Sequence, residues 1–107
     1  MALKIDPKNA LDDMVIGEEY AYALDLTKEL GEKTVNSYTY TIYNNVSADV
    51  TSTFGGGSSI SSGVILFGIK AISSGAYTLV FIVTCDDTLP DALTPYEFHV
   101  TMTVNIT

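Results

Sequence analysis

Residues 96–106 alternate strictly between apolar and polar side chains, and no other feature restricts the fold of this chain so strongly. Successive side chains of a β-strand point to opposite faces, so a period of two predicts a strand with one buried and one solvated face. The apolar row is Tyr96, Phe98, Val100, Met102, Val104 and Ile106.

Further runs share this alternation or are rich in β-branched and aromatic residues, and turn-forming residues separate them. The expected strands cover residues 4–5, 19–26, 34–43, 49–54, 60–72 and 76–85. Residues 27–33 are too few for an independent helix, so one helical turn or a loop ending at Gly31 is expected. The Gly-Gly-Gly-Ser-Ser run at residues 55–59 is predicted to be a flexible loop, and residues 86–94 a second loop.

Short strands with turn signals every ~8–12 residues and no convincing amphipathic helix are typical of a sandwich or small barrel. The sequence therefore predicts an all-β fold, an immunoglobulin-like antiparallel β-sandwich of about seven strands. We expect a single domain over residues 1–107, with a flexible N-terminal segment of about residues 1–14. Tyr77 follows Ser74-Gly75-Ala76, as in a tyrosine corner, whose hydroxyl binds backbone across a turn. The alternative is that Tyr77 is simply the first core aromatic residue of its strand.

The composition argues against several classes of partner. A net charge of −8, with five lysines and no arginine, predicts that the chain does not bind nucleic acid. The acidity favours solubility or docking onto a basic protein surface. No apolar run approaches the ~20 residues of a membrane helix, and the first residues lack the apolar stretch of a signal peptide. Unless an export signal has been removed, we therefore expect a protein that stays in a cytoplasm without contacting a membrane.

Residues that could support catalysis are scarce. The only histidine, His99, lies in the polar row of the last strand, and the only cysteine, Cys85, ends an apolar row. Neither has the partners that a metal site or a nucleophilic centre needs. We expect no catalytic site, no metal and no cofactor. The acidic pairs Asp12-Asp13, Glu18-Glu19 and Asp86-Asp87 fit solvated loop charge, with calcium binding as the open alternative.

The charge distribution suggests an interface. Between residues 34 and 85 the only charged residues are Asp49 and Lys70, and two strands there are apolar on both faces. A sandwich strand normally exposes one face to water, so a second apolar face has to be buried against something else. Another chain could bury it, and the alternative is burial by edge strands or by residues 55–59 of the same chain. The candidate interface residues are Ile65, Phe67, Ile69, Val80 and Ile82.

Three stretches also carry a family resemblance: residues 25–38 (DLTKELGEKTVNSY), residues 74–79 with Thr84-Cys85, and the alternating residues 97–104. Together they resemble small immunoglobulin-like proteins encoded in the structural (head and tail) gene clusters of tailed bacteriophages and prophages. The resemblance covers roughly residues 14–106. It implies a virion component near the head–tail region or a decoration domain, assembled in the bacterial cytoplasm. Its partners would be other virion proteins or further copies of itself. The alternatives are a bacterial immunoglobulin-like module that binds a surface or a carbohydrate, and an accessory domain of a larger protein.

Overall fold

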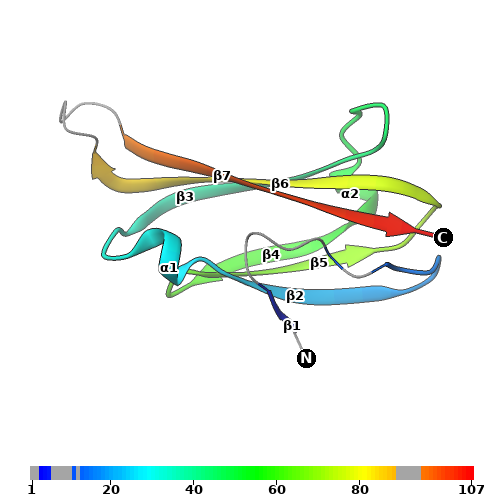
Figure 1. Cartoon of the computed structure of the whole chain (residues 1–107), viewed down its shortest axis with the longest axis horizontal. Coiled ribbons are helices and arrows are strands. Elements are labelled where there is room, and N and C mark those ends of the chain that lie inside the picture. The colour runs from blue at the N-terminus through cyan, green and yellow to red at the C-terminus, as the bar shows by residue number, and fades with distance from the viewer. Residues whose placement is uncertain (1–2, 6–10, 12, 89–94) are drawn as a thin grey trace.

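Two β-sheets face one another in the computed structural model, which describes residues 3–5, 11, 13–88 and 95–107 (Figure 1). One sheet has the strand order β1-β2-β5-β4 and the other the order β3-β6-β7. Neighbouring strands are antiparallel except β1 and β2, which are parallel. The prediction of an all-β fold is confirmed. The strands are β1 (Leu3–Ile5), β2 (Glu19–Asp25), β3 (Val35–Tyr43), β4 (Gly55–Ser61), β5 (Val64–Lys70), β6 (Gly75–Thr88) and β7 (Pro95–Ile106).

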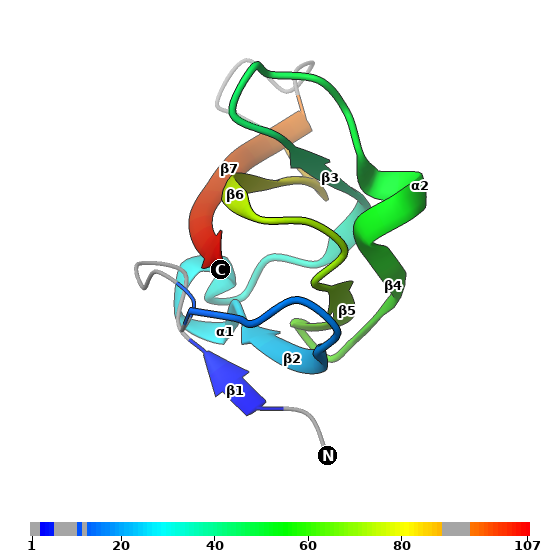
Figure 2. The same cartoon turned by 90° about the vertical axis from the view of Figure 1, so that its right-hand side faces the viewer.

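Two helical turns connect the sheets, α1 (Thr27–Leu30) and α2 (Thr51–Phe54), and α2 lies at one side of the two layers (Figure 2). The expected turn ending at Gly31 is confirmed by α1. The expected strand at residues 49–54 is wrong, because Asp49 favours a turn there. Its carboxylate accepts hydrogen bonds from the amide and the hydroxyl of Thr51, at 2.9 and 2.6 Å. Such local bonds compete with extended backbone.

The glycine-rich run is also different from the expectation, because Gly55–Ser61 forms strand β4 rather than a flexible loop. The expected long strand at residues 60–72 is instead a hairpin, turning at Ser62 and Gly63, which both have positive φ. Pairing with β5 imposes this structure on a sequence of low strand propensity. A side chain at Gly56 or at Gly68 would meet backbone of the other at 3.2 Å, so a Cβ at either position would push the two strands apart by a few tenths of an ångström.

The core lies between the sheets and is centred on aromatic rings. Phe67 of β5 contacts Phe81 of β6 with ring centroids 5.0 Å apart, which joins the two layers. Tyr40 of β3 stacks on Phe81 at 4.9 Å with the rings nearly parallel, and Tyr22 of β2 stacks on Phe67 at 5.5 Å. The predicted apolar rows of β3 and β7 point into this core.

A strap made of Leu11 and residues 13–16 runs along β7. The amides of Leu11 and Met14 donate to the carbonyls of Thr103 and Asn105, each at 2.9 Å. Leu11 and Met14 are both buried in the core. Within the segment of residues 1–14 that was expected to be flexible, these two residues are thus paired with β7, and the flexibility of the segment stays a prediction. Residues 1–2, 6–10 and 12 lie outside the described residues.

Candidate interaction surface

The outer face of the sheet β3-β6-β7, termed here the β6 face, is uncharged over most of its area. Its central strand contributes Val80 and Ile82, which are half-buried, while Leu79, Phe81 and Val83 on the other row are fully buried. Three threonines and one histidine flank the two aliphatic side chains: Thr41 and Thr101 lie beside Val80, and Thr39 and His99 lie beside Ile82. The β6 face comprises Ser37, Thr39, Thr41, Tyr43, Thr78, Val80, Ile82, Thr84, Glu97, His99, Thr101 and Thr103.

Three of the five predicted interface residues are in the core. Ile65, Phe67 and Ile69 of β5 are at most 2% exposed, so their assignment to an outer patch is wrong. Both rows of this strand are apolar, and alternation alone could not decide which row faces inward. The outward row carries Val64 and Leu66, of which Leu66 is 45% exposed. Val80 and Ile82 do face outward, and their role in binding stays a prediction.

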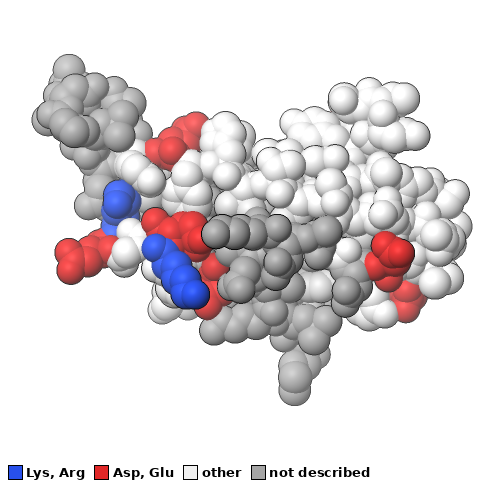
Figure 3. Space-filling view, viewed as in Figure 1, with Lys and Arg blue, Asp and Glu red and all other residues white. Residues whose placement is uncertain are grey.

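The described charges of the β6 face are confined to one end of β7. His99 lies in the polar row, as expected, and its Nε2 is 3.0 Å from Oε1 of Glu97. Both side chains are about half exposed, so the pair contributes little to stability. In Figure 3 acidic side chains gather towards both ends of the molecule, and basic side chains lie only towards the left-hand end. The upper right of that view, over the connection from β3 to α2, is largely uncharged.

Tyr77 and Cys85 both lie in the inward row of β6. The Tyr77 hydroxyl donates to the carbonyls of Ser73 and Ser74, at 3.1 and 3.3 Å, and lies 3.0 Å from Oγ of Ser73. Its ring is buried against Phe54, with centroids 4.6 Å apart. Tyr77 thus combines a core ring with hydrogen bonds across the turn that precedes β6. The Cys85 thiol is buried, as expected for a small apolar side chain.

The acidic pairs do not assemble into a cluster in the part of the chain that the structure describes. There, no group of three or more His, Cys, Asp and Glu side chains is placed to hold a metal ion. Glu18 instead accepts hydrogen bonds from the Tyr20 hydroxyl and the Val15 amide, each at 2.6 Å. These bonds, chiefly the one from Tyr20, lower the pKa of the Glu18 carboxyl. Asp12 and the side chain of Asp87 lie outside the described residues.

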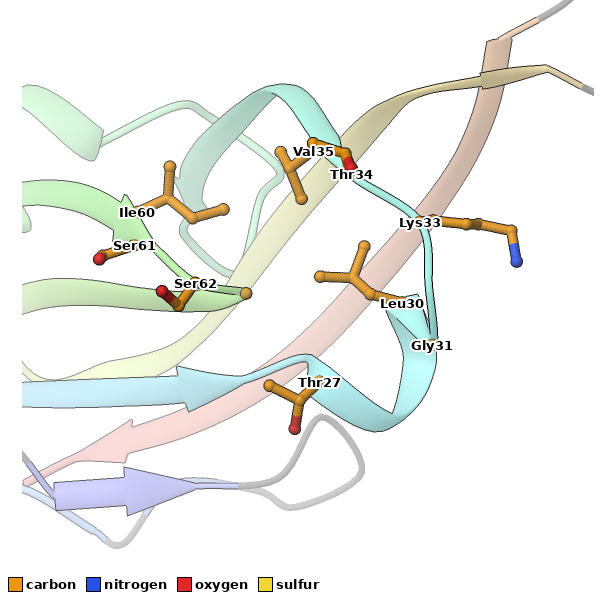
Figure 4. A pocket seen from close by; sticks show the side chains of 10 residues that line it. Thr27, Leu30, Gly31, Lys33, Thr34, Val35, Ile60, Ser61 and Ser62 are labelled. Carbon is orange, nitrogen blue, oxygen red and sulfur yellow. The ribbon is translucent and has the colours of Figure 1, made fainter.

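A cavity of about 420 Å³ opens at the end of the sandwich, between the α1–β3 connection and the turn from β4 to β5 (Figure 4). Leu30, Val35 and Ile60 point into it. Its described lining offers apolar contact, neutral hydroxyls and the stem of Lys33, whose ammonium group lies 4.6 Å from the centre of the Tyr96 ring.

The side of the sandwich between β3 and β4 is a second opening. The Tyr38 hydroxyl spans it by donating to Oγ of Ser58 at 3.0 Å, and the Tyr40 hydroxyl donates to the carbonyl of Gly68 at 3.2 Å. Gly68 lies opposite the bulge of β4, between the pairs that Gly55 and Ser58 form with β5. Burial raises the pKa of Tyr40.

The tyrosines of β2 and β3 do not form a flat aromatic platform. Tyr22 is buried, and Tyr38 and Tyr40 pack against the core. Tyr20 is 39% exposed and Tyr43 is half-buried. Stacking on a sugar needs exposed ring faces. The described surface therefore gives the carbohydrate-binding alternative no specific support.

Comparisons with known proteins give no family for this chain. No protein-family model matches the sequence, and no curated protein matches it. The solution structure of Amebosin aligns with 100% of this chain and 99% of its own, at 17% sequence identity and a TM-score of 0.47. Among the described residues, no helix is long and apolar enough to cross a membrane.

Proposed function

We propose that this chain is a non-catalytic structural protein of a phage or prophage virion, an immunoglobulin-like domain that acts by docking on other proteins. The observation that carries the proposal is the β6 face, a broad β-sheet surface with aliphatic side chains at its centre and charge only at one end. Charge-poor centres surrounded by polar groups are typical of protein–protein interfaces. The resemblance of residues 25–38, 74–79 and 97–104 to phage structural proteins supplies the biological setting.

The strand order supports the immunoglobulin-like part of the proposal. Constant-type immunoglobulin domains pair strands A-B-E-D in one sheet and C-F-G in the other. Numbering the strands of this chain in order gives β1-β2-β5-β4 and β3-β6-β7, which is the same order of strands, although β1 pairs with β2 in parallel and the immunoglobulin sheets are antiparallel. A tyrosine corner ties backbone near the start of strand F, and Tyr77 at the start of β6 makes hydrogen bonds of that kind.

The β6 face suits docking better than exposure to water. A polar outer row would carry charged side chains, whereas Val80 and Ile82 occupy the middle of this one. The surrounding threonines form a rim that can exchange hydrogen bonds with water or with a partner. Removing the exposed apolar surface of Val80 and Ile82 from water stabilises a complex in which another protein buries these side chains.

The test uses the phage or induced prophage that encodes the chain. We expect purified particles to contain the protein in a fixed copy number, detected by quantitative mass spectrometry. The double variant V80T/I82T keeps β-branched side chains and the strand, and it should be lost from particles at least tenfold. L66T, on the outward row of β5, is the matched control and should be retained as wild type. Absence of the wild-type protein from particles would refute the virion role, and equal retention of both variants would refute the β6 face.

A further inference from the structure

The outward edge of β3 is open over its middle. The backbone N–H and C=O groups of Ile42 point away from β6. Its amide donates to Oγ1 of Thr51 at 2.9 Å, and its carbonyl accepts from the Val50 amide at 2.8 Å. Backbone groups of an antiparallel strand alternate between its two edges, so Tyr38 and Tyr40 direct theirs to the same side as Ile42. Among the described residues, no backbone group pairs with them there.

This edge lacks the usual protection against strand pairing. Natural edge strands are kept apart by charged side chains, proline or short length. The nine residues of β3 include neither charge nor proline. By contrast, the strap covers part of the outward edge of β7, where Leu11 binds the Thr103 carbonyl. The open edge of β3 therefore offers hydrogen bonds to an extended strand.

The geometry points to a second copy of this chain as the occupant: two β3 strands pair antiparallel across a two-fold axis, with Thr39 opposite Thr39 of the second copy. In this register Tyr38 of each copy exchanges hydrogen bonds with Tyr40 of the other. The pairing ends where Val50 and Thr51 already occupy the position beside Ile42. The facing position in the second copy is residue 36, at which β3 bulges between Val35 and Ser37.

The area of the β6 face favours this occupant, and here the inference rests on the proposed docking function. Three strands ~4.8 Å apart and seven residues of ~3.4 Å each give a face with a flat projected area of roughly 350 Å². Standard-size interfaces bury about 800 Å² of accessible surface on each partner, so a single β6 face is a small docking surface. The two-fold axis stands perpendicular to the sheet, so both β6 faces point the same way. Pairing joins them into one six-stranded surface of roughly 700 Å².

Charge does not oppose the pairing, although each chain carries −8. Within residues 34–85 the charged side chains are Asp49 and Lys70. Neither lies on β3, and β3 pairs on its other side with the uncharged stretch of β6 from Thr78 to Cys85. The acidic residues responsible for the net charge lie elsewhere, and their mutual repulsion is screened beyond ~8–10 Å at ordinary salt.

Register-specific cross-linking tests the inference on the full chain. Facing residues of a non-hydrogen-bonded antiparallel pair have Cα atoms ~4.5 Å apart, within the range that a disulfide needs. Under mild oxidation we expect T39C to form a disulfide-linked dimer. T41C and T103C are matched controls on the same face: Thr41 would face Ser37 of the second copy, and Thr103 lies at the edge covered by the strap. Dimer yields that are equal for all three variants, or absent for T39C, overturn the inference.

A charge test separates pairing from incidental collision. T39K and T39E each place like charges opposite one another at the axis, so sedimentation velocity should show at least tenfold weaker dimerisation than wild type. An equimolar mixture of T39K and T39E should recover the dimer, which a folding defect would not allow. A strictly monomeric wild type, or a mixture that stays monomeric, overturns the inference. V80T/I82T should still dimerise through β3. Loss of dimerisation therefore tests the β3 pairing, and loss from particles tests docking through the β6 face, so the two proposals can fail separately.

Discussion

Removing the hydroxyl of Tyr40 tests how the two sheets are held together at their open side. The Tyr40→Phe change keeps the ring contacts with Phe81 and Phe67, at 4.9 and 5.2 Å, and deletes only the hydrogen bond to the Gly68 carbonyl. A neutral hydrogen bond contributes about 0.5–1.5 kcal/mol, and the carbonyl left behind is partly shielded from water. We expect the free energy of unfolding to fall by about 1–1.5 kcal/mol and Tm by roughly 4–8 °C.

Tyr38→Phe is the matched control, because the Tyr38 hydroxyl bonds to the exposed side chain of Ser58. Water can replace that partner, so we expect a loss below about 0.5 kcal/mol. Urea denaturation at neutral pH measures both variants. Equal losses for the two variants would contradict the argument, because the difference depends entirely on the burial of the Tyr40 contact.

Alkaline pH adds an independent readout of the same contact. Burial raises the pKa of Tyr40 in the folded state. Above the ordinary tyrosine pKa of about 10, the unfolded chain therefore releases a proton that the folded chain retains. Wild-type stability should fall as pH rises through this range. Tyr40→Phe has no hydroxyl to titrate at this position, so the difference in the free energy of unfolding between wild type and variant should shrink as pH rises. A difference that stays constant with pH would refute the burial of the Tyr40 hydroxyl.

Three further predictions follow from single contacts. Gly68→Ala adds a Cβ 3.2 Å from the Gly56 backbone, and calorimetry should show a loss of about 1–3 kcal/mol as β4 is displaced. Tyr77→Phe removes hydrogen bonds to two backbone carbonyls of the preceding turn, and chemical denaturation should show a loss of about 1–2 kcal/mol. Hydrogen bonds from the side chain and amide of Thr51 lower the pKa of Asp49, so its contribution is present above the ordinary aspartate pKa of about 3.9 and is lost on acidification below it. An NMR titration should find the pKa of Asp49 below its ordinary value. In Asp49→Asn the free energy of unfolding should fall less on acidification than it does in wild type.

The sequence predicts this fold best where one row of a strand is polar. In β7, and in β3 up to Ile42, alternating threonine and apolar residues identify the inward row, and the structure places the apolar rows in the core. Tyr77, which a turn precedes, is likewise found at the start of its strand. In these elements the local sequence pattern and the tertiary packing favour the same inward row, so the pattern predicts burial correctly.

The errors occur where tertiary contacts override local preference. Gly55–Ser61 has the composition of a linker, and its pairing with β5, where Gly56 closely approaches Gly68, makes it an edge strand. In β5 both rows are apolar, so the inward side of Ile65 depends on the opposite sheet. The open edge of β3 depends on which strands are neighbours, and sheet order is a property of the whole chain rather than of any segment.

The strap has a consequence for how the protein folds during synthesis. The Thr107 amide donates to the Met14 carbonyl at 2.9 Å, and these residues are 93 positions apart. A ribosome adding ~5–20 residues per second needs roughly 5–20 s to bridge that distance. Throughout that interval Leu11 and Met14 remain without their docking strand, and their apolar side chains are accessible to chaperones and to neighbouring nascent chains. The domain is therefore expected to close only after β7 has left the exit tunnel, in one late step that completes both ends of the core together.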